Sequence, residues 1–449
     1  MSAPSISRVL VANRGAIARR VIRACHAMGI ETVAVFSEAD AQAPHIDEAT
    51  QAYPLAGFSA SDSYLDQDQL FQIARQSGAD AVHPGYGFLA ENVEFAERVV
   101  AKDKIFIGPQ ARWLGLMGDK VSAREMMSAA GFPVFPGSAL ISDLDQAPAQ
   151  ALALGYPLMV KPVAGGGGMG MRVVASEAEL LAAIGEATAI AKSAFASAGV
   201  YLEKWVSNPR HIEYQIVADN HGHAIHLFER DCSVQRRHQK LIEESPAPGI
   251  DPGQLLHIAN QASQVCEQLG YNNVGTVETL MDTQGISGFL EMNTRIQVEH
   301  GVTEAVTGVD LVQMQIAMAQ GEALPAQPER QGHALEVRLY AEDSLTQRPS
   351  TGLLTTFRPP RLQGVRIETG YREGQQVSPF YDGLLAKIIA SGGSRHQAIG
   401  RAKVALKAFK VVGVSTNAEL LDRILSHEEF LAGRVDTGML ARIIGVPSL

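Results

Sequence analysis

The sequence predicts a multidomain α/β protein, and three observations support this fold class. The chain has 449 residues, which is enough for about three domains. Its N-terminal third alternates short apolar runs with stretches of helical periodicity, and its middle contains two strand signals joined by a glycine-rich loop. Its last third begins with a strand signal and ends in helices, which is the order expected of an α+β unit.

The N-terminal third has the pattern of a parallel sheet with helices between its strands. Runs such as RVLVA and TVAVF are typical of buried strands, and the stretch between them has helical spacing and stops at Gly29. The turn HPGYG at 83–87 follows a later strand, at the strand end where such sheets bind ligands. No GxGxxG follows the first strand, so a dinucleotide site is not favoured. The predicted strands are 8–12, 32–36, 80–83 and 105–107, and the predicted helix is 17–28.

The middle third opens with a capped helix and continues into the glycine-rich loop 164–170 (AGGGGMG). Asp119 is a typical N-cap residue, and Gly131 ends the helix that it begins. Backbone N–H groups of such a loop can close over phosphate oxygens. A flexible hairpin tip is the alternative, but four consecutive glycines are entropically costly to order, so we interpret the loop as a functional lid. The predicted helices are 120–130 and 141–155, and the strands flanking the loop are 158–161 and 171–174.

Strand signals dominate residues 200–300, and a Pro- and Gln-containing linker follows at 324–331. The predicted strands are 200–203, 213–217, 224–228, 276–280 and 288–292, with a helix at 252–269. The last unit has a predicted strand at 333–340 and helices at 395–409 and 417–425.

Composition narrows the classes of function. Hydrophobic residues make up 46% and charged residues 19%, and the net charge is −10, which argues against a nucleic-acid footprint spread over the surface. The three cysteines lack metal-ligand spacing, which indicates reduced thiols. The N-terminal residues lack a signal-peptide pattern and no run of 18 apolar residues exists, so we expect a cytoplasmic protein without a membrane span.

The segment 291–299 (EMNTRIQVE) is the most informative part of the chain. Its polar residues fall at every second position, so an extended strand would direct them all to one face. A solvated sheet face is the alternative, but Asn and Gln are weak strand formers, and five polar groups in a row favour a built site. At about 3.3 Å per residue the run would span about 26 Å, which exceeds one active site, so we expect it to bend.

Three oxygen-bearing side chains suggest a metal site. Glu278 and Glu291 lie near the ends of two predicted neighbouring strands, and Asn293 is two residues further on. Two carboxylates and an amide oxygen suit Mg²⁺ (or Mn²⁺), which usually also binds substrate phosphates. The alternative is a pair of surface glutamates, and the glycine-rich loop favours the metal site.

Basic residues recur near these carboxylates. Lys161 leaves a strand into the glycine-rich loop, and Lys120 lies in the first turn of its helix, so both are well placed for an anionic phosphate. The run 229–240 (ERDCSVQRRHQK) is either a solvated face or part of the same site. The candidate basic residues are Lys120, Lys161, His211, His238 and Lys240.

Arg295, Gln297 and Glu299 are suited to a small planar anion. Arginine holds a planar oxyanion through two parallel hydrogen bonds, and Gln297 can add a third. Glu299 could then accept a proton from the bound species. Bicarbonate is a protonated planar anion that fits all three side chains.

Taken in order, these motifs resemble biotin carboxylase, the ATP-grasp component of biotin-dependent carboxylases, over nearly the whole chain. The motifs are ANRG, HPGYGFL, MGDK, the glycine-rich loop, ERDCS, the 291–300 segment and Arg338 with Glu342 and Asp343. The resemblance implies a Rossmann-like N-terminal domain (1–117), an ATP-grasp central domain (118–325) with a mobile lid at about 134–204, and a C-terminal domain (331–449). It also implies a homodimer.

The resemblance implies a role for each candidate residue. Lys120, Lys161 and the loop glycines Gly165, Gly166, Gly167 and Gly168 would contact ATP phosphates. Glu203, Lys204 and Val206 would frame the adenine, and His211, Gln235 and His238 the ribose and phosphates. Glu278, Glu291 and Asn293 would hold the metal. Arg295, Gln297 and the backbone of Val298 would bind bicarbonate, with Lys240 beside them. Glu299 would be the base, and Arg338 would stabilise the biotin enolate.

The implied reaction has two steps. Bicarbonate attacks the γ-phosphate of ATP to give carboxyphosphate, which releases CO₂ for capture by the enolate of biotin. No Ala-Met-Lys-Met attachment motif is present, so biotin should arrive on a separate biotin carboxyl carrier protein, with a separate carboxyltransferase subunit. The final carboxyl acceptor stays open.

Three departures from the family pattern are Met169 for the Arg of many acetyl-CoA carboxylase members, Gly301 for Pro, and Ala16 for Glu. They leave the lid contacts, the dimer surface and the carboxylase type open. Another ATP-grasp ligase that forms an acyl phosphate would share the lysines, the glycine-rich loop and the glutamates, but would not need 295–299 or Arg338. A non-catalytic subunit is favoured less, because Glu278, Glu291, Lys240 and Arg338 are all present.

Overall fold

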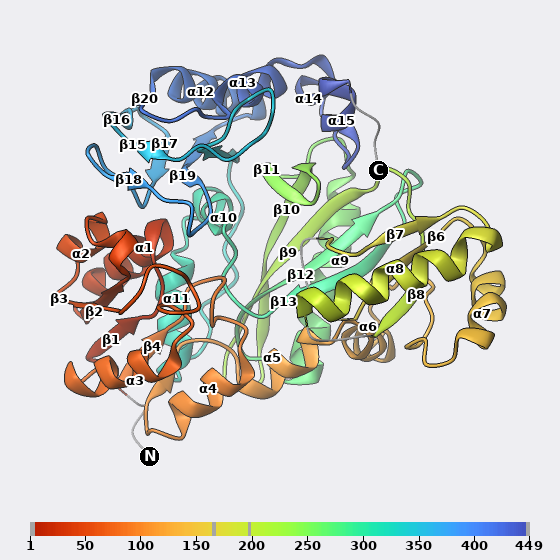
Figure 1. Ribbon diagram of the computed structural model, residues 1–449, viewed down its shortest axis with the longest axis horizontal. Coiled ribbons are helices and arrows are strands. Elements are labelled where there is room, and N and C mark those ends of the chain that lie inside the picture. The colour runs from red at the N-terminus through yellow and green to blue at the C-terminus, as the bar shows by residue number, and fades with distance from the viewer. Residues whose placement is uncertain (1–4, 164–167, 196–198, 446–449) are drawn as a thin grey trace.

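The computed structural model describes residues 5–163, 168–195 and 199–445. A long antiparallel sheet forms the centre, and three groups of elements surround it (Figure 1). Residues near the N-terminus form one lobe, the C-terminal helices form a second, and a small sheet with two helices projects from the opposite side of the centre.

The N-terminal lobe is a five-stranded parallel sheet in the order β3-β2-β1-β4-β5. Three of four residues in β1 are buried, because helices cover both faces of a parallel sheet. Its strands are β1 (Arg8–Val11), β2 (Glu31–Phe36), β3 (Gln51–Pro54), β4 (Ala81–His83) and β5 (Ile105–Phe106). Its helices are α1 (Gly15–Ala27), α2 (Pro44–Glu48), α3 (Gln67–Gln76) and α4 (Val93–Val100).

The central sheet has eight strands in the order β13-β12-β9-β10-β11-β14-β19-β17. It continues from the middle of the chain into the C-terminal part, on both sides of the 324–331 segment. The strands are β9 (Arg210–Ala218), β10 (Ala224–Arg236), β11 (Gln239–Ser245), β12 (Asn273–Met281), β13 (Ser287–Asn293), β14 (His333–Tyr340), β17 (Val365–Glu368) and β19 (Leu384–Gly392). The accompanying helices are α5 (Ala111–Gly118), α6 (Lys120–Ala129), α9 (Pro252–Leu269), α10 (His300–Thr307) and α11 (Leu311–Ala319).

The small projecting unit is a three-stranded sheet in the order β7-β6-β8. It has its own apolar core, to which Leu158, Leu180 and Leu202 contribute. Its elements are α7 (Ala147–Leu154), β6 (Leu158–Pro162), β7 (Arg172–Val174), α8 (Glu177–Phe195) and β8 (Val200–Lys204). The connection between β6 and β7 contains the glycine-rich loop, of which 164–167 lie outside the described residues.

Helices cover one face of β14 and β19 in the C-terminal part, and the largest apolar core lies between them. The helices are α12 (Arg395–Ala408), α13 (Ala418–Ser426), α14 (Glu428–Leu431) and α15 (Met439–Ile444). Two short ribbons complete this part, β15 (Gly352–Leu353) with β18 (Gln376–Val377) and β16 (Thr356–Arg358) with β20 (Lys410–Val412). No helix among the described residues is long and apolar enough to span a bilayer.

Two sequence expectations need correction, and a third is confirmed. The helix expected at 141–155 begins only at Ala147, after a single 3₁₀ turn at Leu144–Gln146. The strand expected at 224–228 continues to Arg236, so most of the charged run 229–240 is itself strand, and its residues 229–235 are buried. Regular strand in the 291–299 segment stops at Asn293, and the remaining residues form a turn that leads into α10, which is the expected bend.

Candidate functional site

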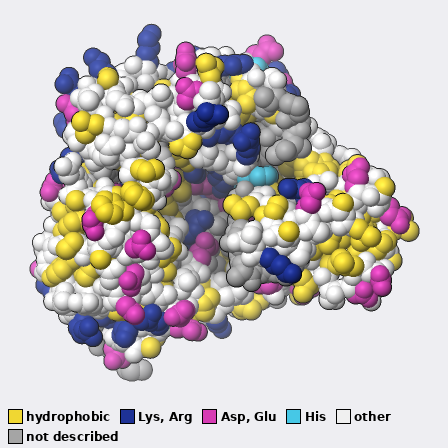
Figure 2. Space-filling view, in the orientation of Figure 1, with side chains coloured by type: hydrophobic (Ala, Val, Ile, Leu, Met, Phe, Trp, Pro, Cys, Tyr) yellow, Lys and Arg dark blue, Asp and Glu magenta, His cyan; other side chains and the backbone are white. Residues whose placement is uncertain are grey.

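A cavity of about 370 Å³ lies where the ends of β12 and β13 meet the β6-β7-β8 unit and β14. The space-filling view shows a hollow at the centre of the molecule with basic and histidine side chains around it (Figure 2). The cavity is lined by all the candidate residues that the structure describes, namely Lys120, Lys161, Gly168, Glu203, Lys204, Val206, His211, Gln235, His238, Lys240, Glu278, Glu291, Asn293, Arg295, Gln297, Val298, Glu299 and Arg338. The candidates Gly165, Gly166 and Gly167 lie outside the described residues.

Glu278 and Glu291 face each other across the antiparallel pair β12 and β13. Opposite residues in such a pair direct their side chains to the same face, and both carboxylates therefore line the cavity. Asn293 donates from Nδ2 to Glu278 Oε1 at 2.8 Å, and Lys120 Nζ lies 3.5 Å from Glu291 Oε2. Hard oxygen donors beside a lysine fit a divalent cation that also binds substrate phosphates.

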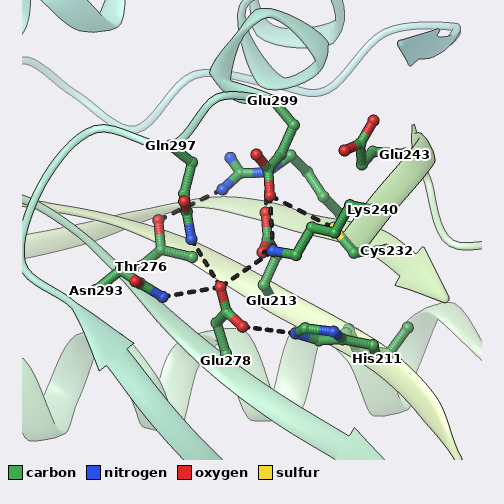
Figure 3. Close-up of polar contacts among 12 residues, drawn as sticks. His211, Glu213, Cys232, Lys240, Glu243, Thr276, Glu278, Asn293, Gln297 and Glu299 are labelled. Atoms are coloured by element: carbon green, nitrogen blue, oxygen red, sulfur yellow. Dashed lines mark hydrogen bonds and ion pairs between the residues drawn. The ribbon is translucent and has the colours of Figure 1, made fainter. Parts of the chain in front are cut away.

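Glu278 is the most heavily contacted of these carboxylates (Figure 3). His211 Nε2 lies 2.6 Å from one of its oxygens, and Gln297 Nε2 and Lys240 Nζ lie 2.7 and 3.1 Å from the other. Burial raises the pKa of the Glu278 carboxyl, but the Lys240 ammonium and His211 outweigh burial and hold the pKa far below its usual range. Glu278 therefore stays ionised, as a metal ligand must.

Lys240 links three buried carboxylates. Its ammonium lies 2.6 Å from Glu213, 3.1 Å from Glu278 and 2.7 Å from Glu299. Burial lowers the pKa of Lys240, but the surrounding carboxylates raise it well above its ordinary value, so the lysine stays charged. Glu213 also accepts a hydrogen bond from the fully buried Arg230 at 2.5 Å. Sequence reasoning missed Glu213, although His211, Glu213 and Gln215 alternate along β9, which is the same kind of signal as in 291–299.

Glu299 is the N-cap residue of α10 and is 1% exposed. Arg338 Nη2 lies 2.8 Å from one of its oxygens, and Lys240 lies 2.7 Å from the other. Burial raises the pKa of the Glu299 carboxyl, but Lys240 and Arg338 outweigh burial and hold the pKa well below its usual range. Arg338 also pairs with Glu243 at 2.5 Å, a second buried carboxylate that sequence reasoning missed.

The turn after β13 brings together the residues suited to a planar anion. Arg295 donates from Nη1 to Gln297 Oε1 at 2.7 Å and from Nη2 to Asn293 Oδ1 at 2.8 Å. Met292 and Ile296, on the other side of the segment, are buried in two separate apolar cores. The alternation of polar and apolar residues therefore continues through the turn, although the strand does not.

The other end of the cavity combines charge with an apolar wall. Lys161 forms a buried ion pair with Glu203, and both lie on the β6-β8 ribbon. Sequence reasoning missed the apolar lining residues Phe135, Met159, Leu280 and Phe289. Strand periodicity could have found two of them, because Met159 and Leu280 lie two residues from Lys161 and Glu278 and so share their faces. It could not have found Phe289, because a register shift places Phe289 opposite Thr279 and not on the face of Glu291.

The structure shows the surroundings of two of the three residues that depart from the family pattern. A Cβ atom at Gly301 would lie 2.5 Å from both Arg366 Nη2 and Ile389 Cδ1, so the missing side chain makes room for Arg366. Met169, in the glycine-rich loop, is 55% exposed. The structure offers no account of Ala16.

Models of known families match three consecutive parts of the chain. Residues 5–114 match the biotin carboxylase N-terminal domain, and residues 336–442 match the biotin carboxylase C-terminal domain. Residues 119–327 match the ATP-binding domain of the carbamoyl-phosphate synthase L chain.

Curated relatives match over nearly the full length. The chain is 46% identical over 443 residues to a biotin carboxylase of Halalkalibacterium halodurans, covering 98% of both chains. It is 45% identical over 442 residues to the rat mitochondrial methylcrotonoyl-CoA carboxylase subunit alpha, covering 97% of this chain and 62% of that protein.

Solved structures agree with these matches and confirm the predicted fold class. A biotin carboxylase complex from Campylobacter jejuni has a TM-score of 0.96 at 40% identity, covering 98% of this chain and 99% of that one. The dimeric biotin carboxylase domain of Hydrogenobacter thermophilus 2-oxoglutarate carboxylase, solved with MgADP, ADP and bicarbonate, has a TM-score of 0.95 at 40% identity, covering 99% and 100%. This chain belongs to the biotin carboxylase family.

Proposed function

We propose that the chain carboxylates biotin carried by a separate carrier protein, using ATP and bicarbonate, as the first half-reaction of a biotin-dependent carboxylase. It is thus an ATP-grasp ligase. One observation carries the assignment of residues: Glu278, Lys240, Glu299 and Arg338 form a continuous chain of contacts along one cavity. These contacts connect carboxylates suited to a metal with a base and a guanidinium suited to the second substrate.

The nucleotide would occupy the end of the cavity at the β6-β8 ribbon. Lys120 and Lys161 would bind its phosphates, and the apolar wall around Met159 would pack against the purine ring. We assign the adenine edge to Glu203, Lys204 and Val206, and the ribose and phosphates to His211, Gln235 and His238. Glu278, Glu291 and Asn293 would hold Mg²⁺, which when bound neutralises charge on the phosphates.

Bicarbonate would bind in the turn that holds Arg295, Gln297 and Val298, beside Glu299. Glu299 would take the bicarbonate proton while a bicarbonate oxygen attacks the γ-phosphorus and ADP leaves, which gives carboxyphosphate. Carboxyphosphate would then break into CO₂ and phosphate, and the phosphate would take the proton from the biotin ureido nitrogen. That nitrogen would attack CO₂, while Arg338 stabilises the negative charge on the ureido oxygen.

The electrostatics of Glu299 require that binding of substrates makes it more basic. Lys240 and Arg338 hold its pKa well below the usual range, despite burial that acts in the opposite direction. A base works best when its pKa is near the operating pH. Bicarbonate and nucleotide phosphates are anions that would compete for the same cations, and each competing contact raises the pKa of Glu299.

The same proposal covers organisation. We propose domains at 1–117, 118–325 with a lid at about 134–204, and 331–449. We also propose a separate biotin carboxyl carrier protein, a separate carboxyltransferase subunit and a homodimer, because a similar solved structure is a dimer. A cytoplasmic location is supported by three cysteines that are free and buried.

Replacing the base tests the proposal. Glu299→Gln keeps the shape of the side chain but removes its proton-accepting carboxylate. We expect ATP binding, measured by calorimetry, within about twofold of the wild type. We expect bicarbonate-dependent ATP turnover with free biotin to fall by about two to four orders of magnitude, which is the usual contribution of a general base. Glu244→Gln is the matched control, because Glu244 is also buried and ion-paired, to Arg395, but lies outside the cavity.

Normal turnover in Glu299→Gln would remove Glu299 as the base. Wild-type protein that hydrolyses no ATP in the presence of bicarbonate and biotin would overturn the proposed function as a whole.

A further inference from the structure

Three successive backbone carbonyls in the turn before α10 each accept a hydrogen bond. The Gln297 carbonyl accepts one from His300 Nδ1 at 2.7 Å, and the Glu299 carbonyl accepts one from the Val302 N–H at 3.0 Å. Both donors are in or next to the same turn. The Val298 carbonyl between them accepts instead from the ammonium of Lys387, which is 89 residues away on β19 in the C-terminal part of the chain.

Lys387 is held firmly in place. Its side chain is 1% exposed, and its ammonium lies 2.7 Å from Glu368 and 3.5 Å from Glu336. In the sheet it stands opposite Arg338 on β14 and opposite Glu368 on β17. Two neighbouring cations of one sheet thus bind two successive residues of the turn. Lys387 binds the Val298 carbonyl, and Arg338 binds the Glu299 carboxylate.

The contact fixes a peptide plane next to the reacting groups. The Val298 carbonyl, the Glu299 N–H and the Glu299 Cα atom belong to one rigid planar unit, so holding the carbonyl also fixes the N–H direction and the Cα atom from which the Glu299 side chain begins. The preceding peptide contains the Val298 N–H, and His300 holds its carbonyl. Lys387 and His300 together therefore orient both peptide planes that flank Val298.

We propose that Lys387 is a positioning residue for carboxylation, which aims the Val298–Glu299 peptide at bicarbonate from outside the cavity. This inference rests on the proposed function and deepens it. Lys387 does not line the cavity, so it acts only through the turn.

Ion pairing with Glu368 and Glu336 does not by itself explain why Lys387 also binds the Val298 carbonyl. Glu368, His300 and Glu304 form a buried group close enough to hold a cation. Arg366 lies 2.8 Å from Glu304 and 3.4 Å from Glu368, and Arg20 lies 2.7 Å from Glu304. Two arginines thus already face the two carboxylates, which leaves no need for a metal there. The ammonium of Lys387 adds a third positive charge, and its hydrogen bond to the Val298 carbonyl connects this charge to the turn.

Lys387→Met tests the proposal because methionine fills similar space without a donor. We expect the KM for bicarbonate to rise by about tenfold and kcat to fall, while the KM for ATP stays within about twofold. A purely structural loss would change both KM values together. Arg395→Met is the matched control, because it breaks another ion pair of the same sheet, between Arg395 at the start of α12 and the buried Glu244 on β11, and neither residue lines the cavity. It should lower the melting temperature and leave both KM values unchanged.

Two further variants keep the test decisive. Lys387→Met/Glu368→Gln also removes the carboxylate that the single change leaves short of a partner, and it should show the same rise in the KM for bicarbonate if the single variant does not fold. Lys387→Arg retains a donor and should recover part of the loss. A folded Lys387→Met or double variant with the KM for bicarbonate of the wild type would overturn the positioning role, while an active wild type in the same assay leaves the proposed function intact. A wild type without bicarbonate-dependent turnover would overturn both.

Discussion

Two buried carboxyl groups that face each other in the central sheet have raised pKa values. Glu336 on β14 stands opposite Glu243 on β11, and both are completely buried. Burial raises the pKa of Glu336 to about 8 and that of Glu243 to about 7, despite the cations Lys387 and Arg338 beside them. Two adjacent carboxyl groups cannot both ionise cheaply in such surroundings, so the pair retains a proton near neutral pH.

The sign of the resulting pH dependence follows from linkage. The pKa of Glu336 is higher in the folded state than in the unfolded state, so the folded state binds more protons between about pH 4.5 and 8. The contribution of Glu336 to stability is therefore complete below this window and is lost as the pH rises through it. Glu336→Gln removes that loss, since the amide does not titrate.

We therefore expect the melting temperature of Glu336→Gln, relative to the wild type, to increase as the pH is raised from 5 to 8. The total change should be on the order of 2–4 °C, from about 1 kcal/mol per pH unit shared within the coupled pair. Glu97→Gln, on the exposed face of α4, is the control and should give a constant difference. A difference for Glu336→Gln that is equally constant would contradict the raised pKa.

At the scale of elements, Gly168 in the connection between β6 and β7 packs closely against His238. Gly168 has a φ of +73°, and a Cβ atom there would lie 2.0 Å from His238 Cδ2. Alanine at this position would strain the backbone and displace the His238 ring, which lines the cavity where we propose that the nucleotide binds. We expect Gly168→Ala to raise the KM for ATP by about tenfold, with a much smaller effect on the KM for bicarbonate.

Gly222, between β9 and β10, provides the control for backbone strain. Its φ is +93°, but no atom lies within 4 Å of the position that a Cβ atom would take, so alanine adds strain of about 1 kcal/mol without a clash. Gly222→Ala should lower the melting temperature and leave the KM for ATP unchanged. Equal KM values for ATP in Gly168→Ala and the wild type would show that His238 has room to move away.

The accuracy of the sequence interpretation also differs between elements. The sequence predicts β12 and β13 and places Glu278 and Glu291 on facing strands, because apolar runs and alternation are local signals. It does not predict that β10 continues through the charged run, because the partners that bury those side chains come from β9 and β11. The contacts of Glu213, Glu243 and Lys387 are not predicted for the same reason. Their partners Lys240, Arg338 and Val298 lie 27, 95 and 89 residues away, respectively.

At the scale of the whole molecule, the N-terminal lobe supports a site to which it contributes no described lining residue of the main cavity. Glu91, between β4 and α4, reaches across and accepts hydrogen bonds from the Thr294 N–H at 3.1 Å and from Arg295 Nε at 2.9 Å. The sequence predicts a ligand-binding strand end at the HPGYG turn (83–87), but it gives no sign of Glu91 or of its contact with Arg295, which is 204 residues away. Only the packing of the lobes makes that connection.

The Glu91 contact predicts that its loss changes the KM for bicarbonate but not the binding of ATP. Glu91 holds the guanidinium of Arg295, to which we assign bicarbonate under the proposed function, so Glu91→Ala should raise the KM for bicarbonate several-fold while ATP binding stays within about twofold. The Glu91 carboxylate is 41% exposed, so added salt should weaken its ion pair with Arg295 in the wild type, whereas the variant has no such pair to lose. The KM for bicarbonate, measured between 50 mM and 500 mM KCl, should therefore converge for the two proteins.

Glu94→Ala, which loses only an exposed pair with Arg98, should behave as the wild type at every salt concentration. If Glu91→Ala also matched the wild type at low salt, Arg295 would be held by Gln297 and Asn293 alone, and the N-terminal lobe would have no part in binding the anion.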